Sequence, residues 1–322
     1  MACSRSSGLI IGGAFVAVAL AGCAASAPQS TSFTPTMSQG LARVHASVAH
    51  SSLATDYTGA RFFISDAADE SVDILTYPGG TQIGQITGLN EPQGTCSHEK
   101  TAWLANTGDS GLVHYNAAGK TIATLSDAGQ YPVGCALDKQ GDLAATNIIS
   151  TSGGPGSVSI WKHATGNPTN YPLPGASRAY FVTYDPRGNL FVDGSNASGA
   201  FVLYELPAGG SALVPITVVG ATINFPGNVK YAYHALELQD QEASQGHAVI
   251  YKTHIRGHKA IVDGRIGFPV LDDATDWCFT PFGTVIVPDA GSASVQIYTY
   301  PAGGLIKTIS GFGQPIDCAF LP

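Results

Sequence analysis

A short glycine-rich phrase recurs along the chain and limits what the chain can fold into. Its copies are Tyr77-Pro78-Gly79-Gly80, Leu206-Pro207-Ala208-Gly209-Gly210 and Tyr300-Pro301-Ala302-Gly303-Gly304, with worn forms at Tyr115 and Trp161. Each copy follows a short stretch of alternating apolar and polar residues, which is typical of a half-buried strand. Repeats of roughly 40–45 residues with several strands each are typical of a β-propeller.

The spacing of the phrase predicts six repeats. The interval from Leu206 to Tyr300 is about twice the others, so a divergent repeat is expected near Tyr251. The segment 315–320 has the form of a repeat opening, whereas the first repeat begins at Arg61 without its first strand. We therefore predict an all-β fold, a six-bladed β-propeller of four-stranded antiparallel blades. Its ring would be closed by the C-terminal strand joining the N-terminal blade, which removes exposed sheet edges.

The N-terminal 22 residues are typical of an export signal. Arg5 precedes an apolar run, residues 8–21, that is shorter than the roughly 20 residues of a membrane-spanning helix. The run ends in Leu20-Ala21-Gly22-Cys23, which resembles the bacterial lipobox, where the cysteine becomes the lipidated first residue. The alternative is an ordinary signal peptide, with Cys23 incidental.

Three segments follow from this interpretation. Residues 1–22 are expected to be a lipoprotein signal peptide, residues 23–60 a lipid anchor and flexible tether, and residues 61–322 the propeller. The tether prediction rests on a stretch rich in Ser, Ala, Thr and Pro. The protein would be exported and held at the bacterial cell envelope by lipid alone, in a leaflet that the sequence does not specify.

The charge balance excludes one class of partner. The chain has 15 Lys and Arg against 23 Asp and Glu, a formal net charge of −8. Phosphate contacts need basic side chains, so a nucleic-acid partner is not expected. The expected partners are an envelope protein, a peptide or a glycan.

Four cysteines remain once Cys3 leaves with the signal and Cys23 is assigned to the anchor. Cys96, Cys135 and Cys318 each lie three or four residues after a proline, and Cys278 lies in the same region of its repeat. Neighbouring repeats would pair Cys96 with Cys135 and Cys278 with Cys318, each closing a loop of about 40 residues. Other pairings and free buried thiols are the alternatives, and metal ligation lacks a Cys-x-x-Cys spacing.

The repeats resemble those of NHL-repeat and related six-bladed propellers, a superfamily that includes gluconolactonase-like enzymes. The resemblance rests on Pro92-Gln93-Gly94 and Pro132-Val133-Gly134, on Asp-x-x-Gly turns and on strand-ending Asn or Asp. It covers residues 61–322, and residues 230–268 depart from it most. It implies architecture, and it leaves activity open.

Polar residues of the first strands are the candidates for a site in the central channel: His98, His234, Glu237, Asp276 and Asp317. A gluconolactonase-like enzyme would need such a cluster to hold a divalent cation and activate water. A solvated channel lining is the alternative that we favour. No catalytic residue is assigned, no cofactor is predicted, and a divalent cation is expected only if the protein is an enzyme.

Five strand-ending residues form a second candidate set: Asp66, Asn106, Asn147, Asp193 and Asp289. They would either supply oxygen ligands to a cation or cap the turns of their own repeats. Recurrence in five repeats favours capping, because a structural need recurs in every blade and a binding site does not.

Three functions remain. The leading hypothesis is a binding or interaction scaffold at the cell envelope without a catalytic role. The alternatives are a metal-dependent hydrolase or lactonase that uses the channel cluster, and a structural envelope subunit. The sequence specifies neither the ligand, nor the functional face, nor the oligomeric state.

Overall fold

The computed structural model describes residues 46–49, 59–243, 248–268 and 271–322. The chain divides into two compact units, residues 1–41 and 42–322, and all described residues belong to the second unit. The predicted signal peptide, Cys23 and most of the predicted tether lie outside the described residues.

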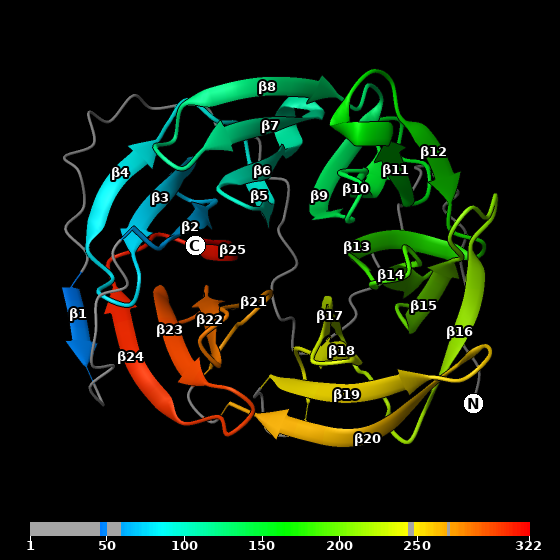
Figure 1. Cartoon of the computed structure of the whole chain (residues 1–322). Helices are drawn as coiled ribbons and strands as arrows, with labels where there is room; N and C mark the ends of the chain where they lie inside the picture. Colours follow the sequence, from blue (N-terminus) through cyan, green and yellow to red (C-terminus); the bar gives the residue numbers. More distant parts are fainter. Residues whose placement is uncertain (1–45, 50–58, 244–247, 269–270) are drawn as a thin grey trace, which may run out of the picture. The chain divides into compact units, whose positions relative to one another are not determined.

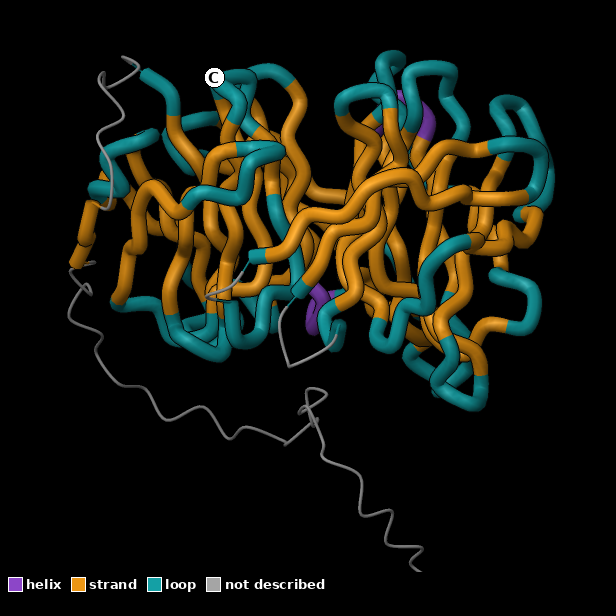
Figure 2. The backbone as a smooth tube through the Cα atoms, turned by 90° about the horizontal axis from the view of Figure 1, so that it is seen from below, coloured by secondary structure: helices purple, strands orange, loops and turns teal. Residues whose placement is uncertain are grey.

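Strands and turns make up nearly all of the described structure. The two exceptions there are short 3-10 helices, η1 (Thr107–Asp109) and η2 (Lys162–Ala164). No helix in the described part is long and apolar enough to cross a membrane. In Figure 2 the turns gather at the two ends of the strands. The predicted all-β class is confirmed.

Antiparallel strands form four-stranded groups, called sheets 1 to 6 here in chain order (Figure 1). Sheet 1 contains β25 (Pro315–Leu321), β2 (Arg61–Asp66), β3 (Ser71–Thr76) and β4 (Gln82–Ile86). Sheet 2 contains β5 (Pro92–His98), β6 (Thr101–Asn106), β7 (Gly111–Asn116) and β8 (Thr121–Ser126). Sheet 3 contains β9 (Gln130–Leu137), β10 (Leu143–Ser150), β11 (Ser157–Trp161) and β12 (Thr169–Pro172).

Sheets 4 and 5 are the two halves of one eight-stranded sheet, because β16 and β20 pair in parallel. Sheet 4 contains β13 (Ala176–Tyr184), β14 (Leu190–Asn196), β15 (Phe201–Leu206) and β16 (Val214–Val219). Sheet 5 contains β17 (Pro226–Ala232), β18 (Ala235–Asp240), β19 (Val249–Ile255) and β20 (Lys259–Gly267). Sheet 6 contains β21 (Cys278–Phe279), β22 (Thr284–Asp289), β23 (Ser294–Thr299) and β24 (Leu305–Ser310).

The N-terminal and C-terminal strands of the domain pair as predicted. β25 lies antiparallel to β2, with Phe62 opposite Phe320 and Ile64 opposite Cys318. The predicted tether shows one difference: β1 (Ala46–Ala49), which lies within it, pairs antiparallel with the outer strand β24. The outer strand of a sheet has unpaired backbone groups that a further strand can use.

The first strand of each sheet lies toward the centre of Figure 1. The first strands of sheets 2 and 3, β5 and β9, advance together, since Gly94 packs on Val133 and Cys96 bonds to Cys135 two residues later. A Cβ atom at Gly94 would lie 2.4 Å from the Val133 carbonyl oxygen, so this contact requires glycine. These two first strands therefore run side by side in the same direction.

Four of the five strand-ending residues accept backbone N–H groups from the first strand of their sheet or from the connection just before it, and Asp66 also accepts one from its own turn. Asp66 accepts the N–H groups of Gly313 and Gln314 at 2.6 and 2.7 Å, just ahead of β25. Corresponding bonds run from Asn90 to Asn106, from Phe181 to Asp193 and from Asp273 to Asp289, each at 2.8 Å. Asn147 of sheet 3 does not follow this pattern. Its amide instead donates to two serine side chains.

Candidate functional site

A cavity of about 190 Å³ lies between the first strands. All six of them line it, with Thr95, Leu137, Thr183, Lys230, Phe279 and Phe320 as one residue from each. Lys230 is the only charged residue of this lining. The cavity is therefore the place where the repeats meet, and Lys230 gives it a positive group.

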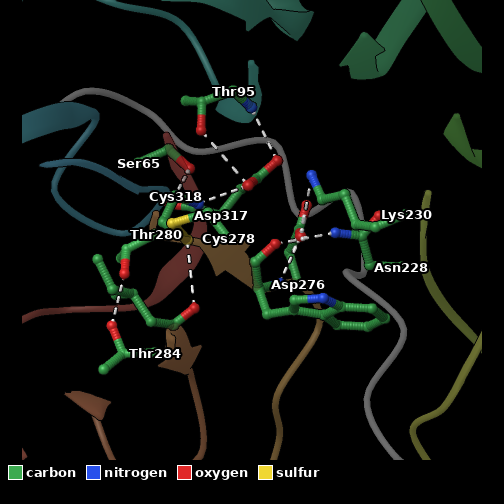
Figure 3. The surroundings of a disulfide bond; sticks show 12 residues. Ser65, Thr95, Asn228, Lys230, Asp276, Cys278, Thr280, Thr284, Asp317 and Cys318 are labelled. Carbon is green, nitrogen blue, oxygen red and sulfur yellow. Dashed lines mark hydrogen bonds and ion pairs between the residues drawn. A yellow bond between two sulfur atoms is a disulfide. The ribbon is translucent and has the colours of Figure 1, made fainter. Parts of the chain in front are cut away.

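Two disulfide bonds line the cavity, and both pairings were predicted from the sequence. Cys96–Cys135 joins the first strands of sheets 2 and 3, with a Cα–Cα distance of 5.6 Å. Cys278–Cys318 joins those of sheets 6 and 1, with a Cα–Cα distance of 5.7 Å (Figure 3). These covalent links hold together two pairs of neighbouring first strands in the cavity wall.

Asp276 and Asp317 form a buried carboxyl pair behind this wall (Figure 3). Their exposed fractions are 2% and 3%, and their side chains hydrogen-bond to each other. Asp317 accepts the Thr95 N–H at 2.8 Å and the Cys318 N–H at 2.5 Å, whereas Asp276 accepts only the Trp277 N–H from the backbone. Asp317 thus has more hydrogen-bond donors to stabilise its ionised form than Asp276 has.

Burial and the neighbouring carboxylate raise the pKa of Asp276 well above its ordinary value. Burial also raises the pKa of Asp317, against the opposing effects of Lys230 and of its hydrogen-bond donors. Two carboxylates in contact cannot both ionise without a large cost, so the pair shares one proton.

Lys230 compensates the remaining negative charge. Its Nζ lies 3.6 Å from Oδ1 of Asp276, and its side chain is 21% exposed. Lys230 lowers the pKa of both carboxyl groups. With one shared proton, the two carboxyl groups carry a single negative charge, and the Lys230 ammonium balances it. The three groups together are then neutral, which is the condition for keeping such groups buried.

This arrangement is suited to holding a ligand more than to transforming one. Neither Asp276 nor Asp317 belongs to the cavity lining, so neither carboxyl group is placed to exchange a proton with a molecule there. Lys230 does line the cavity and is oriented from behind by Asp276. The carboxyl pair therefore positions the cationic group that a ligand would meet.

Glu237 occupies a separate place between sheets 5 and 6. It is fully buried on β18, and its Oε1 accepts a hydrogen bond from the Tyr300 hydroxyl. Burial raises its pKa to about 7, against the opposing effects of Tyr300 and Lys252. Oε2 has no hydrogen-bond partner among the described residues. Glu237 is not part of the cavity lining.

The two candidate histidines are exposed. His98 is the last residue of β5, and His234 lies in the β17–β18 turn beside Tyr233, whose exposed fraction is 50%. Among the described residues, no three His, Cys, Asp or Glu side chains are close enough to hold a metal ion. Of the five predicted channel residues, the structure brings only Asp276 and Asp317 together. The other three lie elsewhere: His98 at the exposed end of β5, His234 in the β17–β18 turn, and Glu237 on the second strand β18.

Lys230 and Thr95 are site residues that were not predicted from the sequence. The predicted set contained only acids and histidines, the groups that a metal site needs. A signal for Lys230 was present: it lies in a first strand of an acidic chain that has few cations. A lysine at such a position needs a carboxylate neighbour, as Asp276 shows.

Comparison with known proteins identifies the fold through similar solved structures. No family model and no curated protein matches the sequence. A structure of the nidogen/laminin complex matches with a TM-score of 0.63 at 13% identity, covering 82% of this chain and 98% of that chain. A gluconolactonase from Xanthomonas campestris matches with a TM-score of 0.56 at 13% identity, covering 80% and 87%. A streptogramin B lyase matches with a TM-score of 0.50 at 13% identity, covering 79% and 74%.

These neighbours are β-propeller proteins, and the likeness shows that this chain has a β-propeller fold. They include enzymes and proteins that act by binding. Identities of 13% show the fold alone, and one fold of this kind supports many unrelated functions. The choice between binding and catalysis therefore rests on the site.

Proposed function

We propose that this protein is an envelope lipoprotein whose six-bladed propeller, closed by β25, binds a ligand at the cavity between its first strands. The cavity carries the proposal, because all six first strands line it and Lys230 supplies its one charged group. Pairing of β25 with β2 and the disulfide between sheets 6 and 1 support a closed ring.

The ligand that fits is an anionic group on a larger partner. Pockets for whole small molecules usually measure about 300–1,000 Å³, and this cavity of about 190 Å³ is smaller. A single carboxylate from a peptide or an acidic glycan would enter and meet the Lys230 ammonium. The rest of the partner would lie on the surface around the cavity opening.

Catalysis by a metal-activated water has less support. The channel acids do not form a ligand set with the histidines, and Lys230 stands 3.6 Å from Asp276, where it supplies the positive charge that a metal would. Two carboxyl groups excluded from the cavity lining also leave no general base facing a substrate.

Lys230→Met is expected to weaken binding of carboxylate-bearing ligands at least tenfold, because it removes the only charged group of the cavity lining. The probes are peptide and glycan arrays that contain matched acidic and neutral members, applied to the purified full chain. Affinity of the strongest acidic hit would then be measured by calorimetry for each variant.

Lys259→Met is the matched control, since Lys259 is exposed on the outer strand β20. It should bind as the wild type does. Circular dichroism and thermal unfolding check that Lys230→Met is folded. Without the lysine charge, the Asp276–Asp317 pair can take up a second proton and stay neutral. The proposal would be overturned if both variants lost the same affinity, or if acidic ligands bound Lys230→Met as tightly as the wild type. A stoichiometric bound metal together with lactone hydrolysis would also overturn it.

The proposed anchor has its own test. Replacing Cys23 by alanine is expected to abolish labelling with a palmitate analogue and to move the protein from the membrane fraction to the soluble exported fraction. The expectation follows from the Leu20-Ala21-Gly22-Cys23 sequence at the end of the apolar run. Persistent labelling in Cys23→Ala would refute lipidation at this residue.

A further inference from the structure

Tyr233 presents an aromatic ring to solvent beside the cavity. Its exposed fraction is 50%, and no other Phe, Tyr or Trp of the described residues is as exposed. The cavity is lined by residues near the ends of the first strands, such as Leu137 and Phe279, the last residues of β9 and β21. The β17–β18 turn, which holds Tyr233, follows the end of another first strand and therefore lies at the same end.

Two neighbouring aromatic rings hold Tyr233 in place and leave one of its faces open. The ring stacks on Tyr300, with centroids 4.9 Å and planes 21° apart, and the Tyr300 hydroxyl donates a hydrogen bond to Glu237. The Phe279 centroid lies 5.5 Å from that of Tyr233 and 4.7 Å from that of Tyr300. A ring on the outer face of Tyr233 would lie much farther from Tyr300 than from Tyr233, so Phe279 stands at the side of the stack. The outer face of Tyr233 therefore faces solvent.

A stack of the same kind, without the exposed ring, occurs in the next sheet. Phe282 in the β21–β22 turn stacks on Tyr77, with centroids 5.6 Å and planes 14° apart. Tyr77 and Tyr300 hold the same position in the repeated glycine-rich phrase. Phe282 is partly buried against the core, and the cavity-lining Phe320 meets its ring edge-on. Stacking on the tyrosine of the phrase therefore does not require an exposed ring, and exposure distinguishes Tyr233.

The backbone of the β17–β18 turn disfavours the side chains that it carries. Ala232 pairs with Ala235, so Tyr233 and His234 are the two central residues of the hairpin, with φ values of 49° and 64°. Two positive φ values define a type I′ turn, in which Asn-Gly is the usual choice. Residues held in such conformations gather at ligand sites, where the side chain is needed. An aromatic residue at this position indicates a role for its ring.

We propose that the anionic ligand of the cavity is an acidic glycan, and that one of its sugar rings stacks on the outer face of Tyr233 while a carboxylate enters the cavity toward Lys230. This inference rests on the proposed function, because it assigns a chemical class to the ligand of the same cavity. The faces of a sugar ring carry C–H groups, which the negative face of an aromatic ring attracts. A uronic acid residue combines such a face with a carboxylate. Lys230 and Tyr233 are three residues apart, about 10 Å of extended chain, so a short stretch of one glycan can contact both.

An acidic peptide fits these observations less well. The anchoring side chains of a peptide usually insert into pockets. The cavity of about 190 Å³ is already assigned to the carboxylate, and Tyr233 lies outside its lining. An open aromatic face beside a small cationic cavity suits a flat ring that carries an acid group. Preferential binding of acidic peptides is therefore an outcome that would count against the glycan.

Calorimetry of the full chain with oligosaccharides of glucuronic, galacturonic and mannuronic acid tests this inference. The wild type should bind at least one of them. Tyr233→Ala should bind it about three- to tenfold more weakly, the factor that an aromatic stacking contact usually contributes. Tyr233→Phe keeps the ring and should bind as the wild type does. Phe282→Ala removes the matched stack and should leave the affinity unchanged, and thermal unfolding checks that both alanine variants are folded.

Methyl-esterified forms of the same oligosaccharides separate this inference from the proposed function. The ester keeps the sugar ring and removes the charge, so Tyr233→Ala should weaken its binding whereas Lys230→Met should not. The glycan inference would be overturned, with the anionic cavity left standing, if acidic ligands depended on Lys230 but no uronic acid oligosaccharide bound or depended on Tyr233. Tighter binding of an acidic peptide, or an equal loss in Phe282→Ala, would also overturn it. Acidic ligands that bind independently of Lys230 would instead overturn the proposed function.

Discussion

Replacing Cys278 and Cys318 together by alanine is expected to lower the free energy of unfolding by about 3–4 kcal/mol. The bond closes a loop with a sequence separation of 40 residues, and it joins sheet 6 to the sheet that β25 completes. Without it, the unfolded chain regains the entropy that the crosslink removes, and the contact between first strands depends on packing alone. Urea unfolding of the exported full chain would measure this decrease in the free energy of unfolding.

A variant without the second disulfide bond is the matched control. Cys96–Cys135 has a sequence separation of 39 residues, so the chain-entropy model gives the Cys96→Ala/Cys135→Ala pair nearly the same cost. Equal losses would mean that both bonds act through the unfolded state. A loss below about 1 kcal/mol for the Cys278–Cys318 pair would contradict its role as a lock between the terminal sheets.

Repetition explains why much of the fold was predictable. The pairing of the four cysteines follows from their similar positions in neighbouring repeats. Asp276 and Asp317 precede Cys278 and Cys318 by two residues and one residue, so the disulfide bond brings them near each other. They are not at equivalent positions, and repetition alone did not predict their contact. Recurrence also indicated a structural role for Asp66, Asn106, Asp193 and Asp289, although the N–H groups they accept come from the first strand or the connection before it and not from the hairpin turn.

The repeats did not predict how far along its strand each side chain lies, which decides whether it is buried. His98 and Asp317 both belong to first strands, yet His98 is exposed at the end of β5 whereas Asp317 is buried near the start of β25. An error of one residue in register also moves a side chain to the other face. Edge pairing was equally inaccessible, because the parallel contact of β16 with β20 depends on how two sheets lie together. No local sequence pattern encodes it.

The folded protein is expected to lose stability as the pH rises, and Glu237 should cause a large share of the loss. Burial raises its pKa from 4.5 to about 7, so the folded state holds this proton more tightly than the unfolded state does. Its contribution is therefore fully present below pH 4.5 and is lost as the pH rises to about 7. At about 1.4 kcal/mol per pKa unit, the loss is about 3 kcal/mol.

Glu237→Gln should remove this dependence, because glutamine keeps the acceptor for Tyr300 and carries no charge. The groups facing Glu237 are Tyr300, Tyr233 and the paired lysines Lys230 and Lys252 of β17 and β19. Asp127 and Asp276 also have raised pKa values and stay in both proteins, so the difference between variant and wild type isolates Glu237. Urea unfolding at pH near 5 and 8 should show the wild type losing about 2.5 kcal/mol more than the variant, because part of the full effect lies outside this pH range. Glu99→Gln, in the exposed β5–β6 turn, should match the wild type at both pH values. Parallel pH profiles for Glu237→Gln and wild type would show that Glu237 is ionised in the folded protein throughout this range.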